Sequence, residues 1–119
     1  MTDTSEQTTN ETRQNHWPDW RSAVHAKEGG PDLVLLHQSD TLKTVLVALG
    51  AGQMLPPHKG AAASFHVLDG TGTILVGEED VEVSPGSTVV IDDGLTRSVR
   101  ATTALTFLGN LGDPASEED

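Results

Sequence analysis

Short apolar runs dominate the chain between residues 32 and 108, and Gly, Pro or Asp interrupts them roughly every ten residues. The runs are rich in Val, Ile and Leu, and no stretch repeats its apolar residues with a helical period. This rhythm predicts an all-β fold, either one closed barrel or a double sheet. The expected strands are Asp32–His37, Leu42–Leu49, Ser64–Leu68, Gly72–Val76, Val81–Val83, Ser87–Ile91, Ser98–Ala101 and Ala104–Leu108.

Turn-forming pairs of residues separate these runs. Asp69-Gly70, Pro85-Gly86 and Asp93-Gly94 combine residues that preset a turn with a glycine that accepts a positive φ. Glu79-Asp80 is expected to turn the chain in the same way. The acidic cluster Glu78–Asp80 would then lie on a hairpin turn and keep a sheet edge soluble.

Both ends of the chain differ from this central part. Residues 1–15 contain hardly any apolar side chain, and residues 112–119 end in an acidic run. Such segments bury too little apolar surface to offset the entropy lost on ordering. We therefore expect disordered ends and one domain over residues 16–111.

The charge balance restricts the partners of this domain. The formal charge is −11, from 18 acidic and 7 basic residues, so this acidic protein is expected to bind neither nucleic acid nor an anionic membrane. There is no Cys, which excludes disulfides and thiolate chemistry. The N-terminal residues lack the pattern of an export signal, and the longest apolar segment, Thr44–Ala51, is too short to cross a bilayer. A cytoplasmic location is expected.

One segment, Asp19–Lys27, departs from the strand pattern. Asp19 is suited to cap a short helical turn that carries Trp20 and Val24. The chain has only two Trp, two Phe and no Tyr, so aromatic packing area is scarce. Trp17 and Trp20 are therefore expected to pack the N-terminal segment onto the barrel.

The segment from Gly50 to Val99 resembles the two sequence motifs of the cupin superfamily. In the first motif a Gly precedes a Pro-containing step, a His-X-His pair, an acid and a strand that ends in Val-Leu-X-Gly. Here Gly52–Gly60 contains Pro56-Pro57-His58, and Phe65–Gly72 reads Phe-His-Val-Leu-Asp-Gly-Thr-Gly. In the second motif Ser84–Ile91 supplies the Pro-Gly turn and the apolar strand, and Arg97 takes the place of the motif's His. The resemblance implies a single small cupin-type β-barrel, a double-stranded, jelly-roll-like fold.

The resemblance also implies a metal site, which this chain does not complete. Metal-binding cupins hold a divalent ion such as Fe, Mn, Ni or Zn with three His and one acid or amide. Of these ligands only His58 is present, because the other positions fall near Gly60, near Ala63 or Ser64, and at Arg97. We therefore expect no metal cofactor.

His66 is the alternative second ligand. Side chains alternate across a strand, so His66 points outward if Phe65 and Val67 point inward. A register shift of one residue would reverse this and would make His58 and His66 a metal pair.

Arg97 places a permanent positive charge where the family has a metal ligand. By strand parity it shares a face with Val99 and Ala101. Two alternatives follow. The guanidinium turns out to solvent or to an acid such as Asp92 or Asp93, or it binds a small anion such as a ligand carboxylate, with His58 as a companion.

These residues predict a metal-free cupin that binds a small molecule or acts as a sensing or assembly module, rather than an enzyme. The expected binding residues are apolar pocket-lining positions with two polar groups at the rim: Leu55, Phe65, Val67, Val89 and Val99, with His58 and Arg97. A small core with few aromatic residues also favours a homodimer, which the resemblance implies as well. The alternatives are a metal-dependent oxygenase or isomerase that uses His58 and His66, and a structural module with a filled interior.

Overall fold

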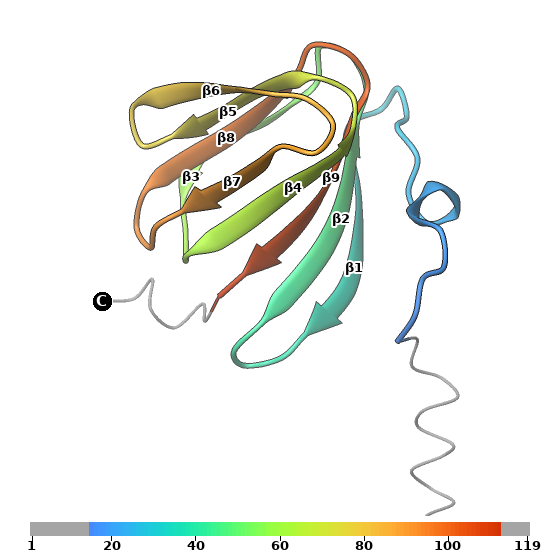
Figure 1. The fold of residues 1–119 in the computed structure, drawn as a ribbon, viewed down its shortest axis with the longest axis horizontal. Helices are drawn as coiled ribbons and strands as arrows, with labels where there is room; N and C mark the ends of the chain where they lie inside the picture. Colours follow the sequence, from blue (N-terminus) through green and yellow to red (C-terminus); the bar gives the residue numbers. More distant parts are fainter. Residues whose placement is uncertain (1–14, 113–119) are drawn as a thin grey trace, which may run out of the picture.

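The computed structural model describes residues 15–112, which form two antiparallel sheets that face each other (Figure 1). One sheet has the strand order β1-β2-β9-β4-β7 and the other β3-β8-β5-β6. The strands are β1 (Asp32–Gln38), β2 (Lys43–Leu49), β3 (Met54–Lys59), β4 (Ala63–Asp69), β5 (Gly72–Val76), β6 (Glu79–Val83), β7 (Thr88–Ile91), β8 (Thr96–Ala101) and β9 (Leu105–Leu111). This confirms the all-β, jelly-roll-like fold. The expected disordered tails lie almost entirely outside the described residues.

Strand β3 is the element that the sequence pattern did not predict. It contains Pro56 and Pro57, and proline cannot donate a hydrogen bond to a neighbouring strand. The strand survives because it lies at the edge of its sheet and pairs with β8 alone. Its register shifts between Leu55 and His58, at the two prolines.

The turn between β5 and β6 also differs from the prediction. The two turn residues are Gly77 and Glu78, and Gly77 has a φ of 64°. A two-residue hairpin turn requires a positive φ, which glycine adopts without strain. Glu79 and Asp80, predicted as the turn, instead begin strand β6.

The core lies between the two sheets and follows the alternation of side chains. On β2, the inward residues Val45, Val47 and Leu49 join the main core cluster, whereas Leu46 and Ala48 point to the outer face. All five are buried because the outer face of this sheet is covered as well. The cover is the N-terminal segment, residues 15–31, which runs beside β1 and β2 on the side away from the second sheet (Figure 1).

The N-terminal segment is attached by a short helical turn and a buried valine. The 3-10 turn η1 (Trp20–Ser22) begins after Asp19, whose carboxylate accepts a hydrogen bond from the backbone N–H of Arg21. That hydrogen bond lowers the pKa of the Asp19 carboxyl. Val24 is 3% exposed and packs on Leu46 and Ala48. This confirms the predicted turn and the packing of the segment onto the barrel. Within residues 15–112, no helix has the length and apolar character needed to cross a membrane.

The β4–β5 turn lies close to the rest of the barrel at Gly70, and a comparison with Gly86, which has a similar φ, measures how much this contact matters. Gly70 and Gly86 have φ values of 86° and 95°. A Cβ on Gly70 would lie 1.8 Å from the carbonyl oxygen of Ala104, whereas one on Gly86 would meet nothing within 4 Å. We expect Gly86→Ala to lower the free energy of unfolding by about 1 to 2 kcal/mol, the cost of a positive φ. Gly70→Ala should lower it by more than about 3 kcal/mol, because the backbone must also move.

Urea denaturation of the two variants and the wild type measures this difference. Equal losses for the two variants would show that the contact between Gly70 and Ala104 does not restrict this turn.

Candidate functional site

Arg97 lies inside the barrel, near one end of strand β8. Its side chain is 1% exposed, and it shares its face of β8 with the buried residues Val99 and Ala101. This agrees with the strand parity expected from the sequence. It contradicts the expectation that the guanidinium turns out to solvent, and also the placement of Arg97 at an open rim.

The guanidinium is held by backbone carbonyl groups from two loops. Its Nε donates a hydrogen bond to the carbonyl oxygen of Leu95 at 3.0 Å, and its Nη2 donates one to that of Gly60 at 3.1 Å. The Gly60 carbonyl also accepts a hydrogen bond from the backbone N–H of Gly94 at 2.8 Å. Arg97 thereby ties the β3–β4 loop to the β7–β8 loop. Carbonyl dipoles directed at the cation offset part of the cost of removing it from water.

His58 is the cross-strand neighbour of Arg97. In the register of β3 and β8 it lies directly opposite Arg97, and Val76 of β5 lies opposite Arg97 on the other side. Directly opposed residues of antiparallel strands project to the same face of a sheet. The structure therefore places on neighbouring strands, opposite each other, the two polar residues that the sequence predicted for one site.

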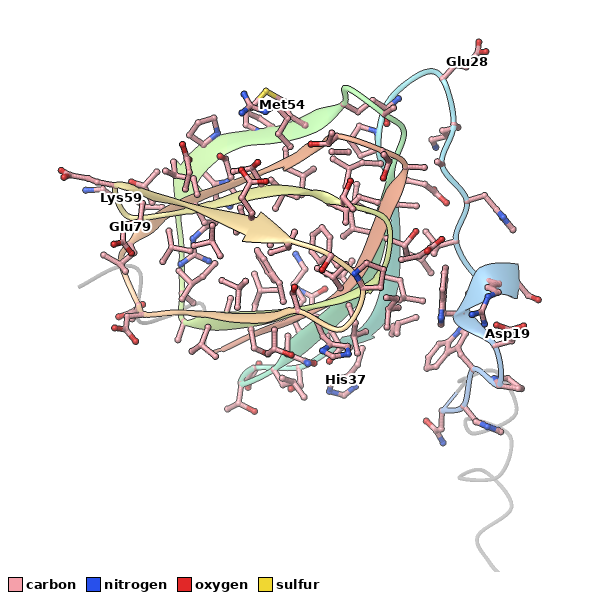
Figure 2. The ribbon with its side chains drawn as sticks, turned by 45° about the horizontal axis from the view of Figure 1, so that its top comes forward. Asp19, Glu28, His37, Met54, Lys59 and Glu79 are labelled. Carbon is pink, nitrogen blue, oxygen red and sulfur yellow. The ribbon has the colours of Figure 1, made fainter. Side chains whose placement is uncertain are left out.

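The two residues differ in exposure. His58 is exposed, and its Nδ1 lies 3.1 Å from the carbonyl oxygen of Pro56. Since a carbonyl only accepts hydrogen bonds, Nδ1 carries the proton in this contact, and Nε2 remains for other partners. The ends of β3, β8 and β5 form what we call the barrel mouth, where Lys59 pairs with Thr96 and Gly77 donates to the Thr96 carbonyl. Figure 2 shows Lys59 and Glu79 at this end of the barrel.

His66 lies away from this pair. Phe65 and Val67, its neighbours on β4, are buried in the core, whereas His66 is exposed on the outer face. Its Nδ1 lies 2.7 Å from the hydroxyl oxygen of Thr88 on β7. The five-stranded sheet thus stands between His66 and the barrel interior, so the register shift that would pair it with His58 does not occur.

The residues present do not fit the metal site that the fold implies. Near the position of His58, the remaining ligand positions are occupied by Gly60, by Ala63 or Ser64, and by the guanidinium of Arg97. A permanent cation at a ligand position repels a divalent ion. In the described part of the chain, no group of three His, Cys, Asp or Glu is placed to hold a metal.

The apolar residues predicted to line a pocket are brought together, but as parts of the packed core. Phe65, Val67, Val89 and Val99 belong to one buried cluster, and Leu55 packs against it. The rings of Phe65 and Phe107 are 4.8 Å apart, centre to centre. These side chains therefore pack against one another inside the barrel.

The sequence analysis missed two features, one at the barrel mouth and one on the outer face of the five-stranded sheet. The carbonyl oxygens of Gly60 and Leu95 are backbone groups, which no residue pattern identifies as partners of Arg97. The second feature is the apolar outer face of the five-stranded sheet, formed by Leu36, Leu46, Leu68 and Leu108. The sequence could have predicted this face, because β2 and β9 carry apolar residues that project to both sides of the sheet.

Comparisons with known proteins agree with this architecture. Residues 44–108 match the family model described as a cupin domain. A conserved protein of unknown function from Streptococcus pyogenes aligns with a TM-score of 0.77 and 22% identity, covering 86% of this chain and 90% of its own. An RmlC-like cupin from Desulfovibrio desulfuricans aligns with a TM-score of 0.74 and 24% identity, covering 86% and 99%.

A predicted oxalate decarboxylase from Thermotoga maritima aligns with a TM-score of 0.65 and 21% identity, covering 69% of this chain and 79% of its own. No curated protein sequence matches the chain. At these identities the solved structures establish the shared fold.

Arg97→Met, with Arg100→Met as the matched control, tests whether the buried guanidinium stabilises the barrel. Both residues lie on β8, but Arg97 points inward and Arg100 is exposed. Hydrogen bonds to a charged group contribute about 1.5 to 3 kcal/mol each, so Arg97→Met should lower the free energy of unfolding by about 2 kcal/mol or more after the apolar gain is counted. Arg100→Met should change it by less than about 0.5 kcal/mol. Urea denaturation measures both; an Arg97→Met protein as stable as the wild type would contradict the tie between the two loops.

Proposed function

Because the chain belongs to the cupin family, we propose that it is a small-molecule-binding cupin that takes a small anion, such as a carboxylate, at the barrel mouth without a metal ion. The observation that supports this proposal is the buried Arg97, a permanent cation at a position where the family has a metal ligand, directly opposite the exposed His58. In metal-binding cupins the charge of the ion attracts anionic groups. Here the guanidinium supplies a fixed positive charge in its place.

The chemistry of the two side chains suits a carboxylate. A guanidinium in a low-dielectric surrounding attracts an anion more strongly than the same group in water. His58 is exposed, and its contact with the Pro56 carbonyl uses Nδ1, so Nε2 takes no part in that contact. We propose that this nitrogen makes a second polar contact to the ligand.

The overall charge limits which anions this site accepts. With a formal charge of −11, the protein repels anions at a distance, and they are attracted only locally, near a cation such as Arg97. Repulsion grows with ligand charge. We therefore propose a singly charged small molecule rather than a phosphate-rich ligand.

Binding of a small carboxylate is tested by two-dimensional proton–nitrogen NMR, with acetate and benzoate as probes. The Arg97 Nε–H, which donates to the Leu95 carbonyl, and the amide of Gly60, whose carbonyl accepts from Arg97 Nη2, are the reporters. Saturable shifts of both resonances are expected. His58→Ala should weaken binding about tenfold, the effect of losing one hydrogen bond to a charged group. His66→Ala, which alters a histidine on the outer face, should bind as the wild type does.

The alternative function, a metal-dependent oxygenase or isomerase, makes the opposite prediction. Elemental analysis of protein purified without chelator would then find one equivalent of Fe, Mn, Ni or Zn, and His58→Ala would remove it. That result, or shifts that appear only after a divalent ion is added, contradicts the metal-independent proposal. If no probe shifts the Arg97 or Gly60 resonances, the third reading, a structural module, is favoured.

We propose in addition that the protein forms a homodimer through the edge strand β1. Leu33 and Leu35 of β1 are 56% and 50% exposed. They pair with Val47 and Val45 of β2, so they project to the inner face of the sheet. This end of the five-stranded sheet thus presents two leucines that the four-stranded sheet leaves uncovered.

The other sheet edges are protected against pairing with a second chain. Strand β6 carries three acids, β3 contains two prolines, and β7 has four residues. Charges, prolines and short length are the usual protections of an edge strand. Strand β1 has seven residues, contains no proline, and after Asp32 has no acidic residue, Lys or Arg. It is therefore the edge strand best suited to pair with a second copy of the chain.

Analytical ultracentrifugation tests the dimer with Leu35→Lys and the control Val90→Lys. Val90 is 69% exposed and lies on β7, at the opposite edge of the same sheet. We expect a dimeric wild type, a monomeric Leu35→Lys protein and a dimeric control, because a buried unpaired lysine disrupts an apolar interface. A monomeric wild type, or a dimer that only Val90→Lys dissociates, would contradict the proposal.

A further inference from the structure

The outer face of the barrel has a hollow that lies apart from the barrel mouth. A ligand bound there would be a second one, different from the anion of the proposed function. The hollow has a volume of about 280 Å³ and is lined by two tryptophans, a proline and four leucines: Trp17, Pro18, Trp20, Leu36, Leu46, Leu68 and Leu108. A second hollow of about 440 Å³ shares Trp17 and Pro18 with it. We infer that the first hollow is a binding site for a small, uncharged aromatic molecule of one or two rings.

The floor of this site is the outer face of the five-stranded sheet. Leu36, Leu46, Leu108 and Leu68 come from β1, β2, β9 and β4, which are consecutive in the sheet. Leu46 and Leu108 are directly paired across β2 and β9. An apolar sheet face of this kind has to be covered to be removed from water.

The N-terminal segment covers this face unevenly. At Val24 the cover is tight, since that residue is 3% exposed. At Trp17 and Trp20 it is looser, because both side chains are only half-buried. The hollow is the space left between these two indoles and the leucines.

The wall of the site is held in place by contacts within the segment. The Arg21 guanidinium lies over the Trp20 ring, 4.7 Å from its centre, and Arg21 Nη1 is 3.1 Å from the Asp19 carboxylate. Asp19 also caps the turn that carries Trp20. Figure 2 shows Asp19 on the segment beside the barrel. These contacts orient Trp20 without filling the hollow.

The composition of the two ends of the chain does not suit this apolar hollow. Residues 1–14 precede the N-terminal segment in the sequence, and their only apolar side chain is that of Met1. Residues 113–119 include four acids, which an apolar surface does not accept. The exposed leucines proposed for the dimer project to the opposite face of the sheet.

The lining determines the class of the ligand. The lining consists only of Trp, Pro and Leu side chains. A charged ligand would lose its hydration there and would find no charged group to replace it. Two indole rings favour a flat aromatic partner, with offset or edge-to-face contacts. An apolar cavity of about 150 Å³ holds benzene, and this hollow is about twice as large.

Toluene is the probe for this site. Trp17 and Trp20 are the only tryptophans in the chain, so both indole N–H resonances in a proton–nitrogen spectrum report on this hollow. We expect toluene to shift both indole resonances saturably and to leave the Arg97 Nε–H unmoved. This separates the result from that of the carboxylate experiment, so either site can fail alone.

Leu68→Phe, which enlarges a residue of the floor, should weaken toluene binding at least about tenfold by filling the hollow. The control Leu42→Phe makes the same change at a residue that is 41% exposed outside this site. It should bind as the wild type does. Trp17→Ala, a change at a half-buried position, provides a second loss-of-binding variant if Leu68→Phe does not fold.

Two results would overturn the inference. One is an absence of saturable shifts in the wild type. The other is a toluene affinity that neither Leu68→Phe nor Trp17→Ala reduces, which would show that the probe binds apolar surface elsewhere.

Discussion

The guanidinium of Arg97 is a permanent charge inside a small apolar barrel, and the chemistry of the site depends on how that charge is accommodated. Carbonyl oxygens of Gly60 and Leu95 accept its hydrogen bonds, which connects two loops at the barrel mouth. The same arrangement places a cation where a metal ligand would stand, and a divalent ion is repelled from such a place. The proposed anionic ligand follows from this fixed charge and from His58, the residue opposite Arg97 on β3.

Burial of the five-stranded sheet on both faces is the second constraint. The inner face packs against the other sheet, and the outer face is covered by the N-terminal segment. Neither cover extends over the whole sheet. The inner one ends before Leu33 and Leu35, and the outer one leaves a hollow beneath Trp17 and Trp20. The surfaces proposed for a second copy and for an aromatic ligand both follow from this incomplete coverage.

The strand pattern predicted most of the fold because side-chain alternation is a local property of extended backbone. All eight predicted strands overlap observed ones. Strand β3 was missed because its prolines are compatible with a strand only at a sheet edge, and edge position is not visible in one sequence. The β5–β6 turn was displaced to Gly77 and Glu78, since a glycine at positive φ defines a hairpin turn more strongly than acidic residues do.

The sequence by itself determined the fold class and which of the site residues share a face of a strand. Alternation places Phe65 and Val67 on one face of their strand and His66 on the other without reference to distant residues. The packing of the two sheets decided that the face of Phe65 and Val67 is the inner one. Only the tertiary structure decided what those side chains meet. The acceptor of the Arg97 Nη2 hydrogen bond is the Gly60 carbonyl, 37 positions away, and a backbone group carries no residue-specific signal. The position of the N-terminal segment depends likewise on packing between elements far apart in the chain.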